Sequence, residues 1–455
     1  MSLQSSSLRC MRAASRVAAV APAARLAAFP AATASRVASA GSPSASSPSR
    51  AFSASALTRS EEFESPFGLN SLQKYSDEEN MIRDTAQRFA QEFIAPKVEA
   101  MDENEKMDPE VIKALFENGF MGIEASAEQG GADMSFTSAI IVIEELAKVD
   151  PSVSVLCDVH NTLVSTVLRK YASEELRAKY MPQLCEGTLG SFCLSEPSSG
   201  SDAFAMKTTC KKSDDGKTWK INGSKMWITN SAEAEFFIVF AQADPSKGYK
   251  GISAFAVEKA MGVQIAKKEK KLGIRASSTC TVNFDDVTVP AENLIGVEGK
   301  GYKIAIEILN EGRVGIAAQM VGLAQGAFEK SVRYAAERVQ FGKPVASNQG
   351  MQFQIAQIAT EIEAARLMTY NAARLKEEGR PFAKEAAMAK LYSSQVAQRA
   401  SGSAIEWAGG QGFTREQGIE KYWRDSKIGA IYEGTSNIQL REIFKRETAR
   451  MGLNL

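Results

Sequence analysis

One carboxylate near the C-terminus of this 455-residue chain lies in a setting that could support proton transfer. Glu433 is part of the stretch IYEGTSNIQL, where it stands between a tyrosine and a glycine. The chain has a single histidine, His160, and histidine is the most common general base in proteins, with carboxylates among the other groups that serve. If this protein moves protons, we therefore expect a carboxylate to do so. A glutamate beside a glycine is also compatible with an ordinary exposed turn.

Other reactive groupings have weak support. His160, in CDVHNTLV, is interpreted as a partly buried helix residue, because no second His or Cys cluster accompanies it to form a metal site. The segment SSGSD lacks the first glycine of a nucleophile elbow, and GKT at 216–218 lacks the upstream glycine of a phosphate loop. No metal is predicted. The cysteines include no CxxC pair and are interpreted as reduced thiols: Cys10, Cys157, Cys185, Cys193, Cys210 and Cys280.

Composition places the chain among ordinary globular proteins. Apolar residues make up 44% and charged residues 24%. Lys plus Arg equals Asp plus Glu at 54 each, so no global field would attract nucleic acid or an anionic membrane. We find no run of about 18 uninterrupted apolar residues and predict no membrane span.

The first sixty residues differ from the rest. They are rich in Ala and Ser, contain no Lys, and carry arginine at 9, 12, 16, 25, 36, 50 and 59, with no acid before Glu61. This composition is typical of a transit peptide, for the mitochondrion first and the plastid second. We interpret residues 1–60 as a mitochondrial transit peptide, cleaved somewhere near 49–56, with a disordered basic tail as the alternative.

The remainder divides into three parts by its periodicity. Residues 69–190 are predicted to form an α-helical domain, which opens with Ser76 as an N-cap before acids and a helical apolar face. Residues 191–299 contain short β-rich runs broken by Asn-Gly, Gly and Pro, as in antiparallel strands. Residues 300–455 contain long helices that suggest a four-helix bundle. The absence of alternating βαβ units argues against a Rossmann enzyme.

Three polar segments lie at the ends of these elements. SFCLSEPSSGSD, at 191–202, offers hydroxyls and backbone N–H groups that suit a phosphate or a ring heteroatom, or it is a linker. KMWITN, at 225–230, places an indole beside a hydroxyl, which suits a flat aromatic ligand, although tryptophan in a strand is usually in the core. ERVQFGKP, at 337–344, ends a helix with basic residues, which the helix dipole alone would favour.

Taken together, these segments resemble the acyl-CoA dehydrogenase family. CLSEPSSGSD, KMWITN, LNEGRVGIAAQMVGLAQGAFE, ERVQFGKP, EWAGGQGF and RDSKIGAIYEGTSNIQL follow one another with the order and approximate spacing of that family, from about Leu69 to the end. GIRASSTC and EAARLMTYNAARL are most similar to the members that act on short and branched acyl chains. The resemblance implies a mainly α fold with an N-terminal α-helical domain, a middle antiparallel β-barrel or sandwich and a C-terminal four-helix bundle.

The resemblance also implies a non-covalent FAD between the β-domain and the bundle. Segments matching the family's contacts to the flavin and its diphosphate contain Phe192, Cys193, Leu194, Ser195, Gly200, Ser201, Trp227, Ile228 and Thr229. Segments matching the adenosine-diphosphate end, usually of a neighbouring subunit's cofactor, contain Arg338, Gln349, Glu406, Trp407, Ala408, Gly409 and Gly410. The pocket should be completed by Thr435, Ser436 and Asn437.

The implied reaction is α,β-dehydrogenation of an acyl-CoA thioester. In the family a carboxylate removes the α-proton while the β-hydrogen leaves as hydride to the flavin, and the resemblance assigns the base to Glu433. The base residue's N–H and a flavin hydroxyl stabilise the developing enolate oxygen. Some family members place the base immediately before the arginine of the NEGR segment, but here that position is Gly312, with Glu311 beside it. Expected acyl-CoA contacts are Ser201, Tyr249, Tyr302, Asn310, Glu311, Gly312, Arg313 and Gly434.

Further expectations come from the same resemblance. Electrons should pass to electron-transfer flavoprotein, the chain should form a homotetramer in the mitochondrial matrix, and the substrates should be short and 2-methyl-branched acyl-CoA esters. Straight short-chain esters are the second choice. An acyl-CoA oxidase would use the same fold and base but pass electrons to oxygen. A catalytically silent helical binding protein is the alternative of a different class.

Overall fold

The computed structural model describes residues 74–453, so the predicted transit peptide lies outside the described residues. The first described part is helical. Its first helix begins at a capping box in which Ser76 Oγ accepts from Glu79 N at 3.1 Å and Glu79 Oε2 accepts from Ser76 N at 2.9 Å. The helices are α1 (Asp77–Phe89), α2 (Val98–Glu103), α3 (Pro109–Glu117), α4 (Phe136–Val149), α5 (Pro151–Asp158), α6 (Thr166–Tyr171) and α7 (Glu174–Glu186).

The middle part is a sheet with the order β6-β7-β3-β2-β4-β5-β8, and β1 pairs with β4. Most pairs are antiparallel as predicted, but β1 and β2 each run parallel to β4. A parallel pair needs a long connection, and the chain between β1 and β4 supplies one that contains β2 and β3. The strands are β1 (Gly190–Cys193), β2 (Thr209–Lys212), β3 (Thr218–Thr229), β4 (Phe236–Gln242), β5 (Ile252–Glu258), β6 (Gln264–Lys268), β7 (Thr279–Pro290) and β8 (Leu294–Ile295).

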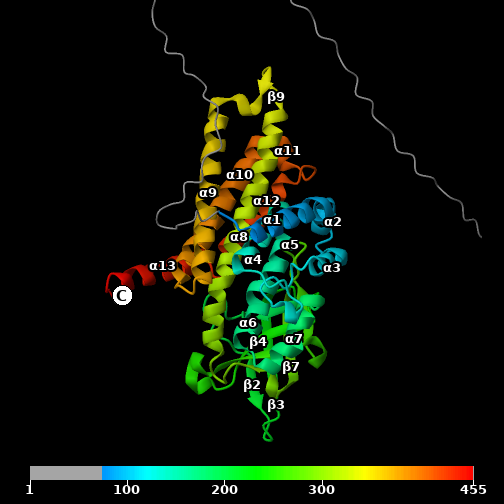
Figure 1. Cartoon of the computed structure of the whole chain (residues 1–455), viewed down its shortest axis with the longest axis vertical. Coiled ribbons are helices and arrows are strands. Elements are labelled where there is room, and N and C mark those ends of the chain that lie inside the picture. Colours follow the sequence, from blue (N-terminus) through cyan, green and yellow to red (C-terminus); the bar gives the residue numbers. More distant parts are fainter. Residues whose placement is uncertain (1–73, 454–455) are drawn as a thin grey trace, which may run out of the picture. The chain divides into compact units, whose positions relative to one another are not determined.

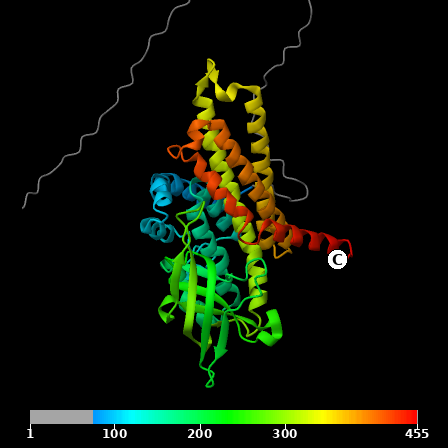
Figure 2. The ribbon, with the colours of Figure 1, turned by 180° about the vertical axis from the view of Figure 1, so that it is seen from behind.

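The C-terminal part is built on three long helices that run side by side (Figure 1). The fourth helix, predicted beyond Ser436, is α13, and it points away from the bundle, as Figure 2 shows from behind. Before it lie a short α12, a 3₁₀ turn at 427–430 and an irregular segment. The elements are α8 (Gly301–Glu337), β9 (Val339–Gln340), β10 (Lys343–Pro344), α9 (Gln349–Glu377), α10 (Ala383–Ala408), α11 (Gly410–Phe413), α12 (Ile419–Ser426) and α13 (Ser436–Arg450). The order confirms the predicted fold class.

One hydrophobic cluster joins the sheet to the bundle. It includes Phe236 and Ile238 of β4 together with Ile316 of α8 and Val396 of α10, all buried. Burial of apolar area at about 25 cal/mol per Å² is the main force that holds these layers together. The junction between the middle and C-terminal parts is therefore a packed interior on which a site can be held rigidly.

Helix α8 lies very close to α4. A Cβ atom on Gly322 would lie 2.2 Å from the backbone oxygen of Glu144, and one on Gly326 would lie 2.1 Å from that of Lys148. These glycines are required because any side chain would force the helices apart.

Across residues 74–453, no helix is both long enough and apolar enough to cross a membrane.

Candidate active site

Glu433 lies in the irregular segment that divides α12 from α13. Its φ is 49° and that of Gly434 is 84°, so two consecutive residues have left-handed backbone, which is unusual for a glutamate. The side-chain amide of Gln439 donates to the backbone oxygens of Glu433 at 2.9 Å and of Gly434 at 2.8 Å. Thr435, not Glu433, caps α13, because its Oγ1 accepts from Ile438 N at 3.4 Å. The carboxylate of Glu433 therefore takes no part in capping α13.

The carboxyl group of Glu433 is shielded but unpaired. Its Oε2 is closed off from solvent and has no hydrogen-bond partner in the described part of the chain. A Cβ atom on Gly312 would lie 2.9 Å from that oxygen and 2.9 Å from Leu163 Cδ2, so the carboxyl lies over a bare stretch of α8. Burial raises the pKa of Glu433 to about 7, against the attraction of Arg313 and Lys390. An unpaired carboxyl with a near-neutral pKa is suited to act as a base.

The backbone N–H of Glu433 is also available. Within residues 74–453 it has no hydrogen-bond acceptor, whereas the N–H groups of Ile431 and Tyr432 both donate to Ile428 O, at 2.8 and 3.2 Å. A free N–H adjoining the proposed base is the donor that a developing enolate oxygen would need.

Glu311 is turned away from this site. Neighbouring residues on an α-helix point about 100° apart, and while Gly312 lies under Glu433, the buried Glu311 forms an ion pair with Lys170 and lies 3.5 Å from Lys376 Nζ. The structure therefore does not bring Glu311 together with Glu433. Its carboxylate is committed to a cluster that links α6, α8 and α9.

The predicted acyl-CoA residues form separate groups: a tyrosine pair at the start of α8, and Asn310 with Arg313 about two to three turns further along the helix. The rings of Tyr249 and Tyr302 meet edge to face with centroids 5.0 Å apart. Arg313 Nη1 donates to Asn310 Oδ1 at 2.8 Å, while its Nε has no partner among the described residues. Ser201 is exposed on the loop after β1. Aromatic faces and a guanidinium with an unused donor could hold an adenine and phosphates.

The two segments predicted to contact the flavin are joined by a buried ion pair. Lys225 Nζ lies 2.8 Å from Glu196 Oε1, and the side chains of both residues are almost completely buried. Lys225 also donates to Leu194 O at 3.0 Å, and Met226 N donates to Ser195 O at 2.9 Å. The loop after β1 and the end of β3 are therefore fixed relative to each other.

Trp227 provides the surface that a flat cofactor requires. It lies at a bulge in β3 with φ of 66° and is 55% exposed, whereas Trp219 of the same strand is 2% exposed. An exposed indole at a bulge fits a stacking partner such as an isoalloxazine ring. By contrast, the Cys193 side chain is in the sheet core, so this residue could contribute to such a site only through its backbone.

The residues predicted for the adenosine-diphosphate end of the cofactor lie at the other end of the bundle, whereas Thr435, Ser436 and Asn437 directly follow the Glu433 turn at the start of α13. Gly312 and Arg338 are separated by 26 residues of α8 and its cap, or about 39 Å along the axis. Arg338 directly precedes β9 and Gln349 begins α9, and both residues are exposed. Figure 1 shows β9 at the far end of the long helices. Trp407 is buried and its Nε1 donates to Gln354 Oε1 at 2.9 Å. The structure thus separates this group from Glu433 within one chain.

His160 has a structural role. Its Nε2 bonds Leu184 O at 2.8 Å and its Nδ1 accepts from Gly190 N at 3.1 Å, and it is fully buried, not partly as predicted. Burial lowers the pKa of His160 to about 4, so the ring is neutral.

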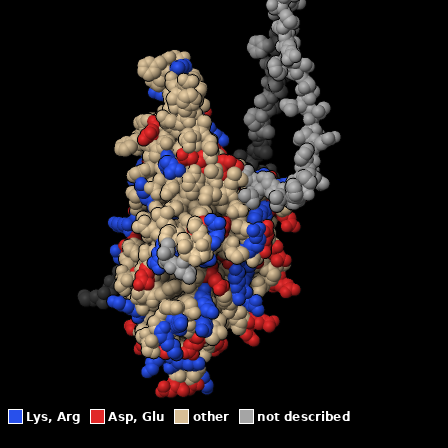
Figure 3. Space-filling view, turned by 90° about the vertical axis from the view of Figure 1, so that its left-hand side faces the viewer, with Lys and Arg blue, Asp and Glu red and all other residues tan. Residues whose placement is uncertain are grey.

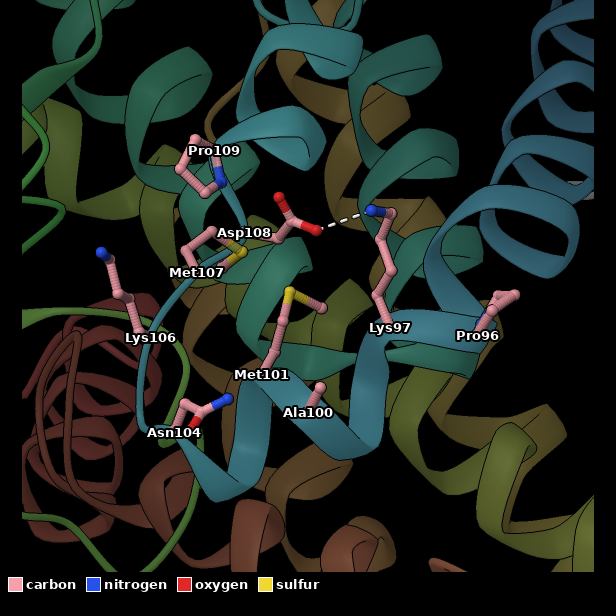
Figure 4. Close-up of a pocket in the computed structure, with 9 residues that line it drawn as sticks. All are labelled: Pro96, Lys97, Ala100, Met101, Asn104, Lys106, Met107, Asp108 and Pro109. Carbon is pink, nitrogen blue, oxygen red and sulfur yellow. Dashed lines mark hydrogen bonds and ion pairs between the residues drawn. The ribbon is translucent and has the colours of Figure 1, made fainter. Parts of the chain in front are cut away.

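The hollow in Figure 4 belongs to the N-terminal helices, where Lys97 Nζ pairs with Asp108 Oδ2 at 2.6 Å, and it shares no residue with the Glu433 site.

Sequence reasoning missed residues that support the site. Lys225 was not distinguished within KMWITN, and Lys390, Gln439 and the buried Asp158 were not considered. A signal did exist for Lys390, since Ala386, Ala387, Ser394 and Ala397 place it on the buried face of α10 at helical spacing. A lysine on such a face needs an explanation.

Family models now define the class of protein. The N-terminal, middle and C-terminal domain models of acyl-CoA dehydrogenase match residues 76–188, 191–287 and 299–448. The chain therefore belongs to the acyl-CoA dehydrogenase family, whose enzymes are FAD-dependent oxidoreductases with this three-domain fold.

Individual relatives give a finer comparison. The chain is 55% identical over 375 residues to the mitochondrial short/branched chain specific acyl-CoA dehydrogenase of Rattus norvegicus. This alignment covers 82% of this chain and 86% of the rat protein. A solved butyryl-CoA dehydrogenase from Megasphaera elsdenii superposes with a TM-score of 0.80 at 40% identity, over 82% of this chain and 98% of that one. A chain from a structure of the electron transferring flavoprotein of Acidaminococcus fermentans superposes with a TM-score of 0.81 at 41% identity. The match covers 82% of this chain and 99% of that one.

Proposed function

We propose that this chain oxidises short and 2-methyl-branched acyl-CoA thioesters to 2-enoyl-CoA esters, with Glu433 as the base. The observation that carries the proposal is the shielded, unpaired carboxyl of Glu433 over Gly312. The 55% identity to a short/branched chain specific enzyme supports the substrate class. The likeness to butyryl-CoA dehydrogenase keeps straight short-chain esters as the second candidate.

The chain's own groups account for the proton transfer. The carboxylate of Glu433 takes the α-proton. The backbone N–H of the same residue donates to the thioester oxygen, on which negative charge develops. Bound FAD supplies the acceptor for the hydride that leaves the β-carbon. Trp227 and the loop held by the Lys225–Glu196 pair would hold the ring system. Gly312 leaves room beside the carboxyl because a side chain there would collide with it.

Assembly and electron transfer are part of the same proposal. The cofactor residues at the β9 end would serve the FAD of another subunit in a homotetramer. Val339, Phe341 and Phe353 are exposed at this end, and Figure 3 shows few charged side chains over its upper tip. Exposed apolar groups of this kind mark contact surfaces. We propose electron-transfer flavoprotein as the acceptor and the mitochondrial matrix as the location, given the mitochondrial relative and the Arg-rich N-terminus.

A role in fatty-acid and branched-chain amino-acid breakdown, including that of isoleucine, follows from this substrate class. The prediction is that purified protein loaded with FAD is bleached without oxygen by 2-methylbutanoyl-CoA and isobutanoyl-CoA at least about tenfold faster, as kcat/KM, than by esters of twelve or more carbons. Stopped-flow absorbance across a panel of CoA esters would measure this.

The same panel separates the alternatives. Preference for long chains would contradict the substrate class, and faster bleaching by butanoyl-CoA would favour the straight-chain reading. Hydrogen peroxide formed in step with turnover would indicate an oxidase. A colourless protein that takes up no FAD would indicate a silent binding protein.

A further inference from the structure

One buried lysine beside Glu433 has no carboxylate partner. Lys390 is completely buried in α10, and among the described residues no carboxylate oxygen lies within 4.0 Å of its Nζ. The other fully or nearly buried lysines differ: Lys225 has Glu196 at 2.8 Å, and Lys421 has Asp425 at 2.7 Å. Burying a charge without a direct counter-ion costs several kcal/mol, so such a group needs a reason.

The contact that Lys390 does make leads to the active-site turn. Its Nζ donates to Gly434 O at 2.7 Å, and Gly434 directly follows the proposed base. The same oxygen also accepts from the Gln439 side chain at 2.8 Å. Two side chains, from α10 and α13, therefore hold one carbonyl within a turn in which Glu433 has an unfavourable left-handed backbone.

The charges around the turn are few. Lys390 interacts electrostatically with Glu433, which attracts it, and with Arg313 of α8, which repels it. Burial lowers the pKa of Lys390 to about 7. Glu433 in turn is attracted by Arg313 and Lys390 and lies near Asp158 and Tyr432. Burial raises the pKa of both Asp158 and Tyr432 well above the usual values, and Tyr432 is therefore neutral near pH 7.

We propose that Lys390 is a positioning residue for Glu433: its amine fixes the carbonyl of Gly434, and its protonated form favours the ionised carboxylate. The inference rests on the proposed function, in which Glu433 must be ionised to accept the α-proton. It explains why a lysine amine is buried at this point of α10 without a direct ion pair.

The test compares Lys390→Met and Lys390→Gln with Gln439→Met in the FAD-loaded protein. Loss of the protonated amine should move the midpoint of the pH dependence of flavin reduction upward by at most about one unit, because the pKa of Lys390 is itself near 7. The rate should then fall by up to about tenfold below the midpoint and recover at high pH. Gln439→Met removes a neutral donor from the same carbonyl, so it should lower the rate without moving the midpoint. Infrared difference spectra across pH, assigned through Glu433→Gln, should show the same shift without turnover.

Each outcome decides between the accounts. An unchanged midpoint in a Lys390 variant that folds and binds FAD would overturn the proposal, as would an equal shift in Gln439→Met. If both Lys390 variants fail to fold, the residue is needed for the fold alone and the proposal is also overturned. Wild-type protein that is not bleached by any acyl-CoA would instead overturn the proposed function.

Discussion

Replacing Glu433 by glutamine should slow substrate-driven bleaching of the bound flavin by a factor of about 10² to 10⁴. The amide has nearly the same shape but cannot accept the α-proton, and it removes no hydrogen bond because Oε2 has no partner among the described residues. The fold and FAD binding should therefore be retained. Anaerobic stopped-flow absorbance with 2-methylbutanoyl-CoA measures the rate.

Glu311→Gln is the matched control. Glu311 adjoins the position where some family members carry their base, but its carboxylate pairs with Lys170 and lies near Lys376. Its replacement should lower stability and leave the bleaching rate of the folded protein within about threefold of wild type, because the base is untouched. The assignment of the base would fail if Glu311→Gln stopped the reaction and Glu433→Gln did not.

The second large effect concerns stability. Replacing Lys225 by methionine should destabilise the protein by about 3–5 kcal/mol, because Glu196 would be left buried without its counter-charge. Urea unfolding of the FAD-loaded protein measures the change. The double variant Lys225→Met, Glu196→Gln should be more stable than the sum of the single effects predicts, since it leaves no unpaired charge.

Lys220→Met serves as the control on the same strand. Lys220 lies 3.8 Å from Asp286 and both side chains are exposed, so this pair should contribute less than about 1 kcal/mol. Equal destabilisation by Lys220→Met and Lys225→Met would contradict the role assigned to the buried pair.

Much of the fold was predictable because its signals are local. Ser76 and Glu79 form a capping box in sequence and in structure, and the long helices α8, α9 and α10 follow from unbroken helical periodicity. The parallel pairing of β1 with β4 was not predictable, because no residue in either strand specifies a partner more than forty positions away.

The turn around Glu433 likewise depends on contacts between distant segments that the sequence does not specify. The motif around Glu433 drew attention to the residue that we propose as the base, whereas its left-handed backbone conformation was not predicted. The clamp by Gln439 and Lys390 depends on how α10 and α13 pack against the turn, which sequence spacing does not contain. Glu311 and Gly312 are adjacent in sequence, yet only the helix geometry shows that they face different partners.

The most direct test of the central claim is the pH dependence of flavin reduction by wild-type protein at subsaturating substrate, a condition that reports the ionisation of the free enzyme. Burial raises the pKa of Glu433 to about 7, and only the ionised carboxylate can take the proton, so the rate should rise with pH and reach half its maximum near pH 7. A rate that is constant from about pH 5 to about pH 9, or that falls as the pH rises through 7, would contradict a buried carboxylate base.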